Sequence, residues 1–231
     1  MFDNIKVIAF DADDTLWVNE PYFREAEEQF CSLLEDYLPH HSVSQELYKT
    51  EMANLALYGY GIKSVILSMI ETVLRVTENT APPEIILKVI QYGQELLNKP
   101  IELLDGVETV LQSLYGKYRL VVATKGDLLD QERKLQKSGL AHFFHHIEIM
   151  SDKKEKDYRK LLKHLDCSPA EFLMIGNSLK SDVLPVLALE GHAVHIPYHI
   201  TWEHERIDHT IEHPQFFQFE AISDILPHLL P

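Results

Sequence analysis

Acidic side chains directly follow the first apolar run of this sequence. Residues 5–10 read Ile-Lys-Val-Ile-Ala-Phe, and Asp11, Asp13, Asp14 and Thr15 come next. A short run of β-branched and aromatic residues is typical of a buried parallel strand. Two carboxylates held close together repel each other unless a cation, a shared proton or different surroundings relieve the repulsion. Because hard divalent cations prefer oxygen ligands, this spacing indicates a divalent metal site at the end of the first strand.

Polar side chains also stand at the ends of later strands. Thr124 and Lys125 end a second apolar run, and Asn177 follows a third, with Asp182 five residues further on. The carboxyl ends of parallel strands share one edge of a sheet, where α/β proteins bind ligands. A hydroxyl and an ammonium group suit a phosphoryl group, and the additional oxygen atoms suit Mg²⁺.

Strands and helices alternate from residue 100 onward. The predicted strands are residues 5–10, 119–124, 146–150, 171–176 and 192–196. The predicted helices in this part are residues 106–115, 128–138, 158–165, 182–189 and 224–230. We assign the His-rich and aromatic tail, residues 198–219, to loop. This alternation predicts an α/β fold with a Rossmann-like parallel sheet and helices on both of its faces.

Residues 19–97 show helical patterns and no strand pattern. Apolar residues recur at helical spacing in segments 20–38, 43–58, 62–77 and 82–97. This all-α segment is inserted after the first strand. We therefore expect two domains, an α/β core of residues 1–18 and 98–231 and a helical domain of residues 19–97.

Four motifs, in this order, resemble the haloacid dehalogenase (HAD) superfamily. They are Asp-x-Asp-x-Thr at 11–15, Thr124 after the second strand, a lysine before a helix, and Gly-Asn-Ser-x-x-x-Asp at 176–182. The resemblance covers nearly the whole chain, and the helical insert stands where that superfamily carries a helical cap. One such motif is a weak signal, but four of them at strand ends are a strong one.

The resemblance implies a phosphatase that works through a phosphoaspartate. Asp11 would be the nucleophile, and Asp13 would protonate the leaving group and then activate water. An acid at position 13 distinguishes the phosphatases from the dehalogenases of the superfamily. Thr124, Lys125 and Lys153 would hold the oxygens of the phosphoryl group.

The resemblance also implies Mg²⁺ as the cofactor. Its ligands would be the Asp11 carboxylate, the Asp13 backbone carbonyl, Asp182 and Asn177. The superfamily usually carries an acid where this chain has Asn177. Because asparagine keeps an oxygen ligand but lacks the charge, we expect weaker metal binding without loss of activity.

The lysine motif has three candidates in the turn at 151–156. We prefer Lys153, which lies five residues before the expected helix start at Tyr158, over Lys154 and Lys156. Runs of charged residues are usually solvated surface, so the pattern alone leaves the choice open.

Composition restricts the partners. The 231 residues carry 21 basic and 36 acidic side chains, which give a net charge of −15 with histidine neutral. This charge disfavours nucleic acid and anionic membranes as partners. No signal peptide pattern or membrane-spanning apolar run occurs, and the widely separated Cys31 and Cys167 indicate reduced thiols in a cytoplasmic protein. We expect a monomer or homodimer with a small phosphorylated substrate.

Three functions stay open at this level. The favoured one is a Mg²⁺-dependent phosphatase acting on a nucleotide, a sugar phosphate or a flavin phosphate. A phosphomutase would use the same phosphoaspartate and return the group to its substrate. A non-catalytic phosphate-binding regulator is compatible with Asn177. Dehalogenation fits least, because of Asp13.

Overall fold

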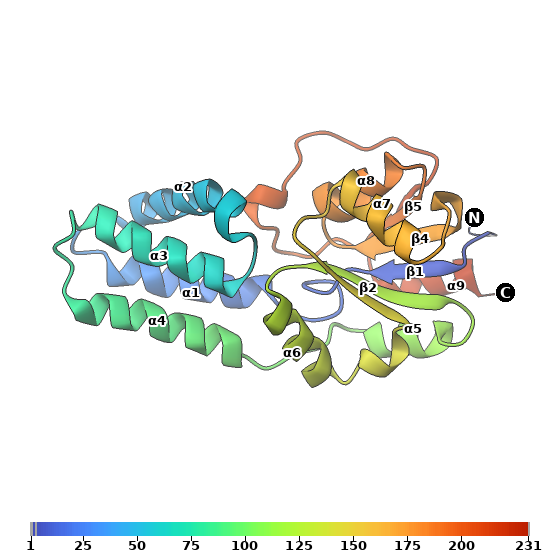
Figure 1. Ribbon diagram of the computed structural model, residues 1–231, viewed down its shortest axis with the longest axis horizontal. Coiled ribbons are helices and arrows are strands. Elements are labelled where there is room, and N and C mark those ends of the chain that lie inside the picture. The colour runs from blue at the N-terminus through green and yellow to red at the C-terminus, as the bar shows by residue number, and fades with distance from the viewer. Residues whose placement is uncertain (1, 3, 231) are drawn as a thin grey trace. The chain divides into compact units, whose positions relative to one another are not determined.

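The computed structural model of the chain describes residues 2 and 4–230, and a six-stranded parallel sheet is its main feature (Figure 1). The strand order is β3-β2-β1-β4-β5-β6. The strands are β1 (Val7–Phe10), β2 (Arg119–Lys125), β3 (His146–Met150), β4 (Phe172–Gly176), β5 (His192–His195) and β6 (Phe216–Gln218). Every neighbouring pair is parallel. The predicted α/β, Rossmann-like fold is therefore confirmed.

Helices cover both faces of this sheet. They are α5 (Val107–Leu114), α6 (Leu128–Ser138), α7 (Glu155–His164), α8 (Leu184–Leu187) and α9 (Leu226–Leu229). The side chains of β1 alternate between the two faces, as the pleat of a strand requires. Ile8 and Phe10 belong to the cluster that contains Val107 of α5, whereas Val7 and Ala9 belong to the cluster that contains Tyr158 of α7. Because β1 is buried on both faces, only its end is free to carry polar groups.

The position of β1 brings the ends of three strands together. It pairs with β2 on one side and with β4 on the other. The connection after β1 leads to β2, and the chain later returns to the other side of β1 as β4, so the strand order reverses there. Open α/β sheets bind ligands at such a switch point, beyond the carboxyl ends of the strands.

Several segments differ from the sequence-based expectation; the helix predicted to begin at Tyr158, for example, begins at Glu155. Residues 216–218 form the edge strand β6 inside the tail that we assigned to loop. A three-residue strand is too short to show a period-2 pattern, so only its pairing with β5 defines it. The helix expected at 182–189 begins earlier, with a π-helical turn at Leu179–Val183, because the Ser178 hydroxyl accepts a hydrogen bond from Ser181 N.

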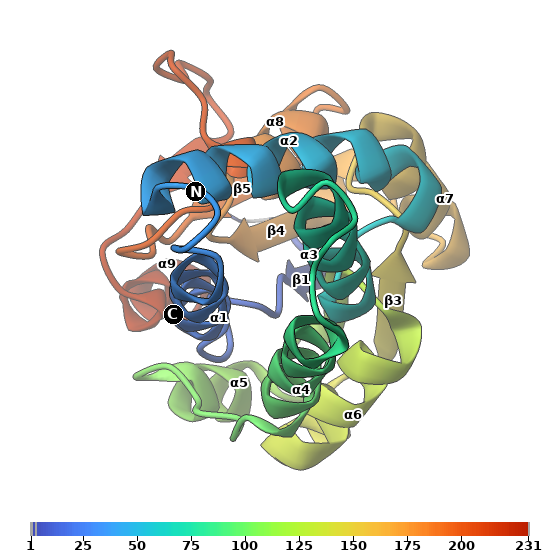
Figure 2. The same cartoon turned by 90° about the vertical axis from the view of Figure 1, so that its left-hand side faces the viewer.

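A second compact unit contains residues 21–100 together with 126–130. Its main helices are α1 (Glu20–Leu33), α2 (His40–Tyr58), α3 (Ile62–Val76) and α4 (Pro83–Asn98). Phe30, Leu47, Met69 and Val89 are fully or almost fully buried in the core between them. In Figure 2, α1, α3 and α4 are seen nearly end-on, whereas α2 runs across the view. The role of residues 19–97 as a cap stays a prediction.

Among the described residues, no helix has the length and apolar character needed to cross a membrane. Cys31 and Cys167 are both free cysteines.

The buried sheet gives a prediction about stability. Leu173 of β4 is 0 % exposed, and Leu173→Ala should lower the free energy of unfolding by about 3 kcal/mol, because it removes apolar contacts and leaves a cavity. Leu129 is 56 % exposed, and Leu129→Ala should change the free energy by no more than about 0.5 kcal/mol. Urea denaturation of both variants measures the difference, and equal losses would contradict this assignment of the core.

Candidate active site

Asp11 stands at the carboxyl end of β1 and is buried. Its backbone N–H donates to the carbonyl oxygen of Ile175 at 2.9 Å, so the end of β1 is fixed to β4. Beyond it the chain turns sharply, and the amides of Leu16 and Trp17 donate to the carbonyl oxygen of Ala12 at 2.8 and 3.3 Å. The turn brings the following side chains back toward the sheet edge.

A lysine from outside this strand is paired with Asp11. The Nζ of Lys153 donates to Asp11 Oδ1 and, at 2.7 Å, to Asp182 Oδ1. All three side chains are buried, and Lys153 is only 3 % exposed. Burial raises the pKa of Asp11 to about 7 although Lys153 opposes this shift. Burial lowers the pKa of Lys153, but Asp11 and Asp182 together raise it above its usual value, so the ammonium stays charged.

The geometry selects Lys153 from the three candidate lysines. Lys154 pairs with Asp152 at 2.7 Å, and its side chain is 68 % exposed. Lys156 is also exposed. Of these three lysines, Lys153 is the one that donates to Asp11 and Asp182. Its role in holding a phosphoryl group remains a prediction.

Asp182 is fixed through both of its oxygens. While Oδ1 accepts from Lys153, Oδ2 accepts from the backbone N–H of Ser178 at 2.9 Å. The carboxylate packs directly on Gly176, where an added Cβ would lie 2.2 Å from Asp182 Oδ2. Position 176 must therefore be glycine, because the Asp182 carboxylate lies so close to its backbone. The contact that Asp182 makes with another charged group is the hydrogen bond from Lys153. Whether Asp182 also binds a metal ion, as we expected, stays a prediction.

The side-chain amide of Asn177 lies beside Asp11 and the backbone oxygen of Asp13. The side-chain amide of Asn177 faces Asp11 Oδ2 and the backbone oxygen of Asp13, each at 3.2 Å from the facing amide atom. If the Asn177 amide oxygen faces these two atoms, three acceptors meet. If the NH₂ group faces them, it donates a hydrogen bond to each. Neighbouring ligand oxygens around Mg²⁺, which binds them at about 2.1 Å in octahedral geometry, lie about 3.0 Å apart. The oxygen-in orientation therefore fits a bound Mg²⁺, and the NH₂-in orientation satisfies the same atoms without a cation.

The neighbours of Asn177 hold it in place. The hydroxyl of Thr15 lies 3.1 Å from Asp11 Oδ2 and 3.3 Å from Asn177 Oδ1. His195, buried at the end of β5, has Nε2 3.0 Å from the carbonyl oxygen of Asn177. Its Nδ1 lies 3.1 Å from the Gln218 side chain of β6. His195 thus links the candidate metal loop to the edge strand that the sequence did not reveal.

Asp13 points toward α6. Its carboxylate accepts from Trp17 Nε1 at 2.8 Å, from Gln131 Nε2 at 2.7 Å and from Lys134 Nζ at 2.9 Å. Burial raises the pKa of Asp13, but Lys134, Gln131 and Trp17 outweigh it and hold the pKa below its usual value. The side chain is therefore an ionised carboxylate. Sequence reasoning missed Gln131 and Lys134, although their i, i+3 spacing places them on one face of the helix.

Thr124 and Lys125 lie at the end of β2. Thr124 is buried, and its hydroxyl lies 3.5 Å from the carbonyl oxygen of Lys125, a distance that leaves the donor for a stronger acceptor. The Lys125 ammonium instead donates to Ser181 Oγ at 2.9 Å and to the Glu205 carboxylate. Thr124 and Lys125, both predicted to hold phosphate, thus differ in their contacts: Lys125 binds Ser181 and Glu205, whereas the Thr124 hydroxyl makes a long contact with a backbone oxygen.

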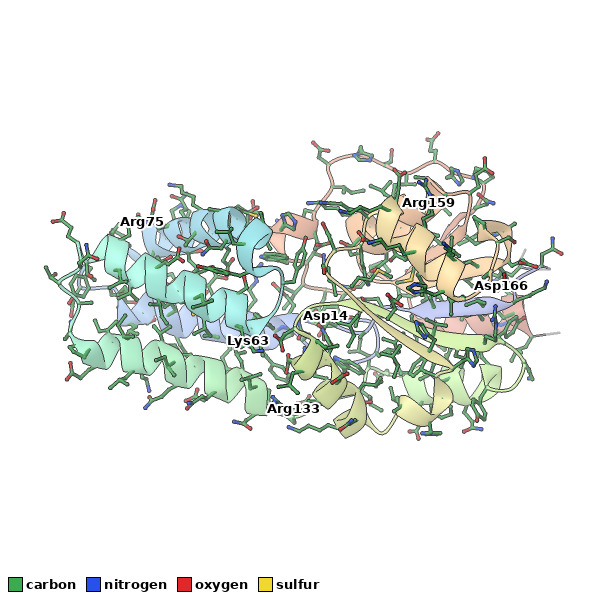
Figure 3. All side chains as sticks on the ribbon, in the orientation of Figure 1. Asp14, Lys63, Arg75, Arg133, Arg159 and Asp166 are labelled. Atoms are coloured by element: carbon green, nitrogen blue, oxygen red, sulfur yellow. The ribbon has the colours of Figure 1, made fainter. Side chains whose placement is uncertain are left out.

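Asp14, labelled in Figure 3, supports the turn after β1. Its backbone has a positive φ of 60°, and its carboxylate accepts from the amides of Asn19 at 2.8 Å and Glu20 at 2.9 Å. Burial raises the pKa of Asp14 to about 8, although both amides oppose the shift.

Three of the four sequence motifs, those that carry Asp11, Lys153 and Asp182, meet through direct hydrogen bonds. A model of the haloacid dehalogenase-like hydrolases matches residues 5–187. The chain belongs to this family. The predicted superfamily and the prediction of a hydrolytic enzyme are therefore confirmed.

Individual members of the family resemble the chain to different degrees. A HAD-like family hydrolase from Xanthomonas campestris, solved by crystallography, is 36 % identical, with a TM-score of 0.88 over 98 % of this chain and 92 % of that one. A glyceraldehyde 3-phosphate phosphatase of Methanopyrus kandleri is 23 % identical over 185 residues, 78 % of each chain. A magnesium-bound HAD hydrolase of Bacillus subtilis is 17 % identical, with a TM-score of 0.67 over 99 % of this chain and 100 % of that one, which shows a shared fold.

Within residues 2 and 4–230, no group of three or more His, Cys, Asp or Glu side chains is arranged to hold a metal ion. The candidate magnesium site is of a different kind, because it combines carboxylate oxygen with an amide oxygen and a backbone carbonyl.

The buried Lys153 gives the second prediction. Lys153→Met removes the cation between Asp11 and Asp182 and should lower the free energy of unfolding by about 3–5 kcal/mol, because two buried carboxylates then face each other. Lys154→Met, at the exposed neighbouring lysine, should change it by about 0.5 kcal/mol or less. Chemical denaturation measures both. A Lys153→Met protein as stable as Lys154→Met would show that the buried pairing contributes nothing.

Proposed function

We propose that this protein is a Mg²⁺-dependent phosphatase that hydrolyses a small phosphorylated metabolite through a phosphoaspartate on Asp11. The observation that carries the proposal is the buried pairing of Asp11 with Lys153. Asp13, a second acid two residues after Asp11, is ionised. A carboxylate held beside a fixed ammonium group is oriented for attack on a phosphorus atom, while the cation offsets the charge of the incoming phosphate.

The reaction would take place in two displacements. In the first, a carboxylate oxygen of Asp11 forms a bond to phosphorus, the ester P–O bond breaks, and the leaving alcohol takes a proton from the protonated form of Asp13. In the second, water attacks the phosphoaspartate and gives its proton to Asp13 as the bond from phosphorus to Asp11 breaks. The products are the alcohol and inorganic phosphate, and Asp11 is regenerated. General acid–base catalysis of this kind accelerates a reaction by about 10²–10⁴-fold.

The contacts of Asp13 match the base half of this cycle. The ionised carboxylate, held by Trp17, Gln131 and Lys134, is the form that accepts a proton from water. For the acid half, Asp13 must gain a proton and exchange these contacts for the leaving-group oxygen. We propose that Lys134 and Gln131 hold the Asp13 side chain in position in the interval between its protonation of the leaving group and its acceptance of a proton from water.

The candidate magnesium ligands are the Asp11 carboxylate, the Asp13 backbone carbonyl and the Asn177 side chain. They are supported by the position of the Asn177 side-chain amide, which lies 3.2 Å from both Asp11 Oδ2 and the Asp13 backbone oxygen. When bound, Mg²⁺ neutralises charge that develops on the phosphoryl oxygens. Lys153 and Thr124 would bind other oxygens of the same group, and Asp182 would keep Lys153 in position.

The proposed substrate class is supported by the relatives and by the helical insert. Two glyceraldehyde 3-phosphate phosphatases, from Methanopyrus kandleri and Methanothermobacter thermautotrophicus, are 23 % and 25 % identical to this chain. We propose a small phosphate monoester, with residues 19–97 acting as a cap that selects it. Glyceraldehyde 3-phosphate comes first in a test panel, followed by nucleotides, sugar phosphates and flavin mononucleotide.

The third prediction tests the two acids. With p-nitrophenyl phosphate and Mg²⁺, Asp11→Asn should lower turnover by at least about 10⁴-fold, because the nucleophile is lost. Asp13→Asn should lower it by about 10²–10⁴-fold and leave a slow burst of phosphorylation, because Asp11 remains. Stopped-flow absorbance separates the burst from steady-state turnover. Removal of Mg²⁺ with EDTA should abolish both phases.

Asp208→Asn is the matched control, because the Asp208 side chain is fully exposed, and it should keep full activity. Full turnover in Asp13→Asn would show that the acid–base assignment is wrong. A strict requirement for a bisphosphate activator would instead indicate a phosphomutase. No turnover of any ester on the panel, together with tight phosphate binding, would indicate a non-catalytic regulator.

A further inference from the structure

A buried acid from the tail reaches the candidate site. Glu205 closes a short 3₁₀ helix, Glu203–Glu205, that lies outside all four sequence motifs. It is 9 % exposed, whereas Glu203 of the same helix is exposed. A buried carboxylate is costly unless charges and hydrogen bonds compensate it. Its surroundings must therefore supply both.

The partners of Glu205 come from two motif-bearing segments. Its Oε1 accepts from the Lys125 ammonium, at the end of β2. Its Oε2 accepts from the hydroxyls of Ser178 at 2.5 Å and Ser181 at 2.6 Å. Burial raises the pKa of Glu205, but Lys125 and the two hydroxyls outweigh it and lower the pKa to about 2. Glu205 is thus a fixed negative charge.

The two serine partners belong to the loop that carries Asn177, a candidate metal ligand, and Asp182, which orients Lys153. Ser178 follows Asn177 directly, and Ser181 precedes Asp182. The Ser178 hydroxyl also accepts from Ser181 N at 3.0 Å, while Ser178 N donates to Asp182. Glu205 therefore binds Ser178 and Ser181, which lie at the two ends of the short loop between Asn177 and Asp182.

Counting the charges shows what Glu205 adds. With both carboxylates ionised, Asp11 and Asp182 contribute −2 and Lys153 contributes +1, so these three paired groups carry −1. The Lys125 ammonium, which bonds to Ser181 of the same loop, would bring the sum to zero. Glu205 cancels that charge, whereas Asp152 leaves the sum unchanged because Lys154 pairs with it at 2.7 Å. With Asn177 neutral, a residual negative charge is what attracts a divalent cation.

We propose that Glu205 is a positioning residue of this site. It holds the Lys125 ammonium away from the phosphoryl position and keeps the site net negative, so that Mg²⁺ binds despite the missing acid at Asn177. The inference deepens the proposed function by naming a residue outside the motifs that sets the balance between cation and anion binding.

The balance predicts opposite effects on the two ligands. In Glu205→Gln the charge of Lys125 is no longer cancelled, so the dissociation constant of Mg²⁺ should rise about tenfold. The dissociation constant of inorganic phosphate, measured at saturating Mg²⁺, should fall several-fold, because the same positive charge attracts the anion. A residue that only supports the fold would weaken both ligands together or neither.

Isothermal titration calorimetry on the full chain tests this with Mg²⁺ and then with inorganic phosphate. Glu203→Gln is the matched control, because it makes the same change two residues away on an exposed side chain. The double variant Lys125→Met/Glu205→Gln restores the charge count and should return the Mg²⁺ dissociation constant to within about twofold of the parent. Circular dichroism verifies that each variant is folded.

Weaker Mg²⁺ binding, tighter phosphate binding and recovery in the double variant would support the proposal. Unchanged binding in Glu205→Gln, or weakening of both ligands without recovery, would overturn it. If Glu205→Gln does not fold, Lys125→Met supplies the test: it should tighten Mg²⁺ binding, and weaker or unchanged binding overturns the proposal. Because these readouts need no turnover, a protein that binds both ligands but hydrolyses no ester would contradict the phosphatase function alone.

Discussion

The pairing of one buried ammonium group with two buried carboxylates governs this site. Lys153 lies between Asp11 and Asp182, and it relieves the repulsion that these acids would otherwise feel in a low-dielectric environment. The surrounding structure serves this arrangement. β1 in the centre of the sheet carries the first acid, and the Ser178 amide fixes the second. Losing the cation would leave two buried carboxylates without a compensating positive charge between them, which proteins tolerate poorly.

The same arrangement leaves little negative charge for a metal ion. Once Lys153 is counted, the two acids retain a single net charge, and Asn177 adds an oxygen but no charge. Metal binding in such a site depends on the exact placement of neutral oxygens and on charges just behind them. This is why a lysine–glutamate pair beside the loop, formed by Lys125 and Glu205, matters for the chemistry.

The sequence predicted the central strands and the motif residues because both have local signals. β1, β2 and β4 are continuous apolar runs, and polar residues stand directly at their ends. The partners of these residues had no local signal. Gln131 and Lys134 contact Asp13 across more than 100 positions in the chain, and Glu205 lies in a tail whose composition suggested only loop. Such contacts are determined by tertiary packing, which composition and periodicity do not contain.

The close packing of Asp182 on Gly176 restricts how this site can vary among relatives. A side chain at position 176 would occupy the space of the Asp182 carboxylate, so such a change requires a smaller residue at 182 at the same time. A smaller residue there would remove a partner of Lys153. Positions 176, 182 and 153 should therefore covary as one unit, and a family member that departs at one of them should depart at the others.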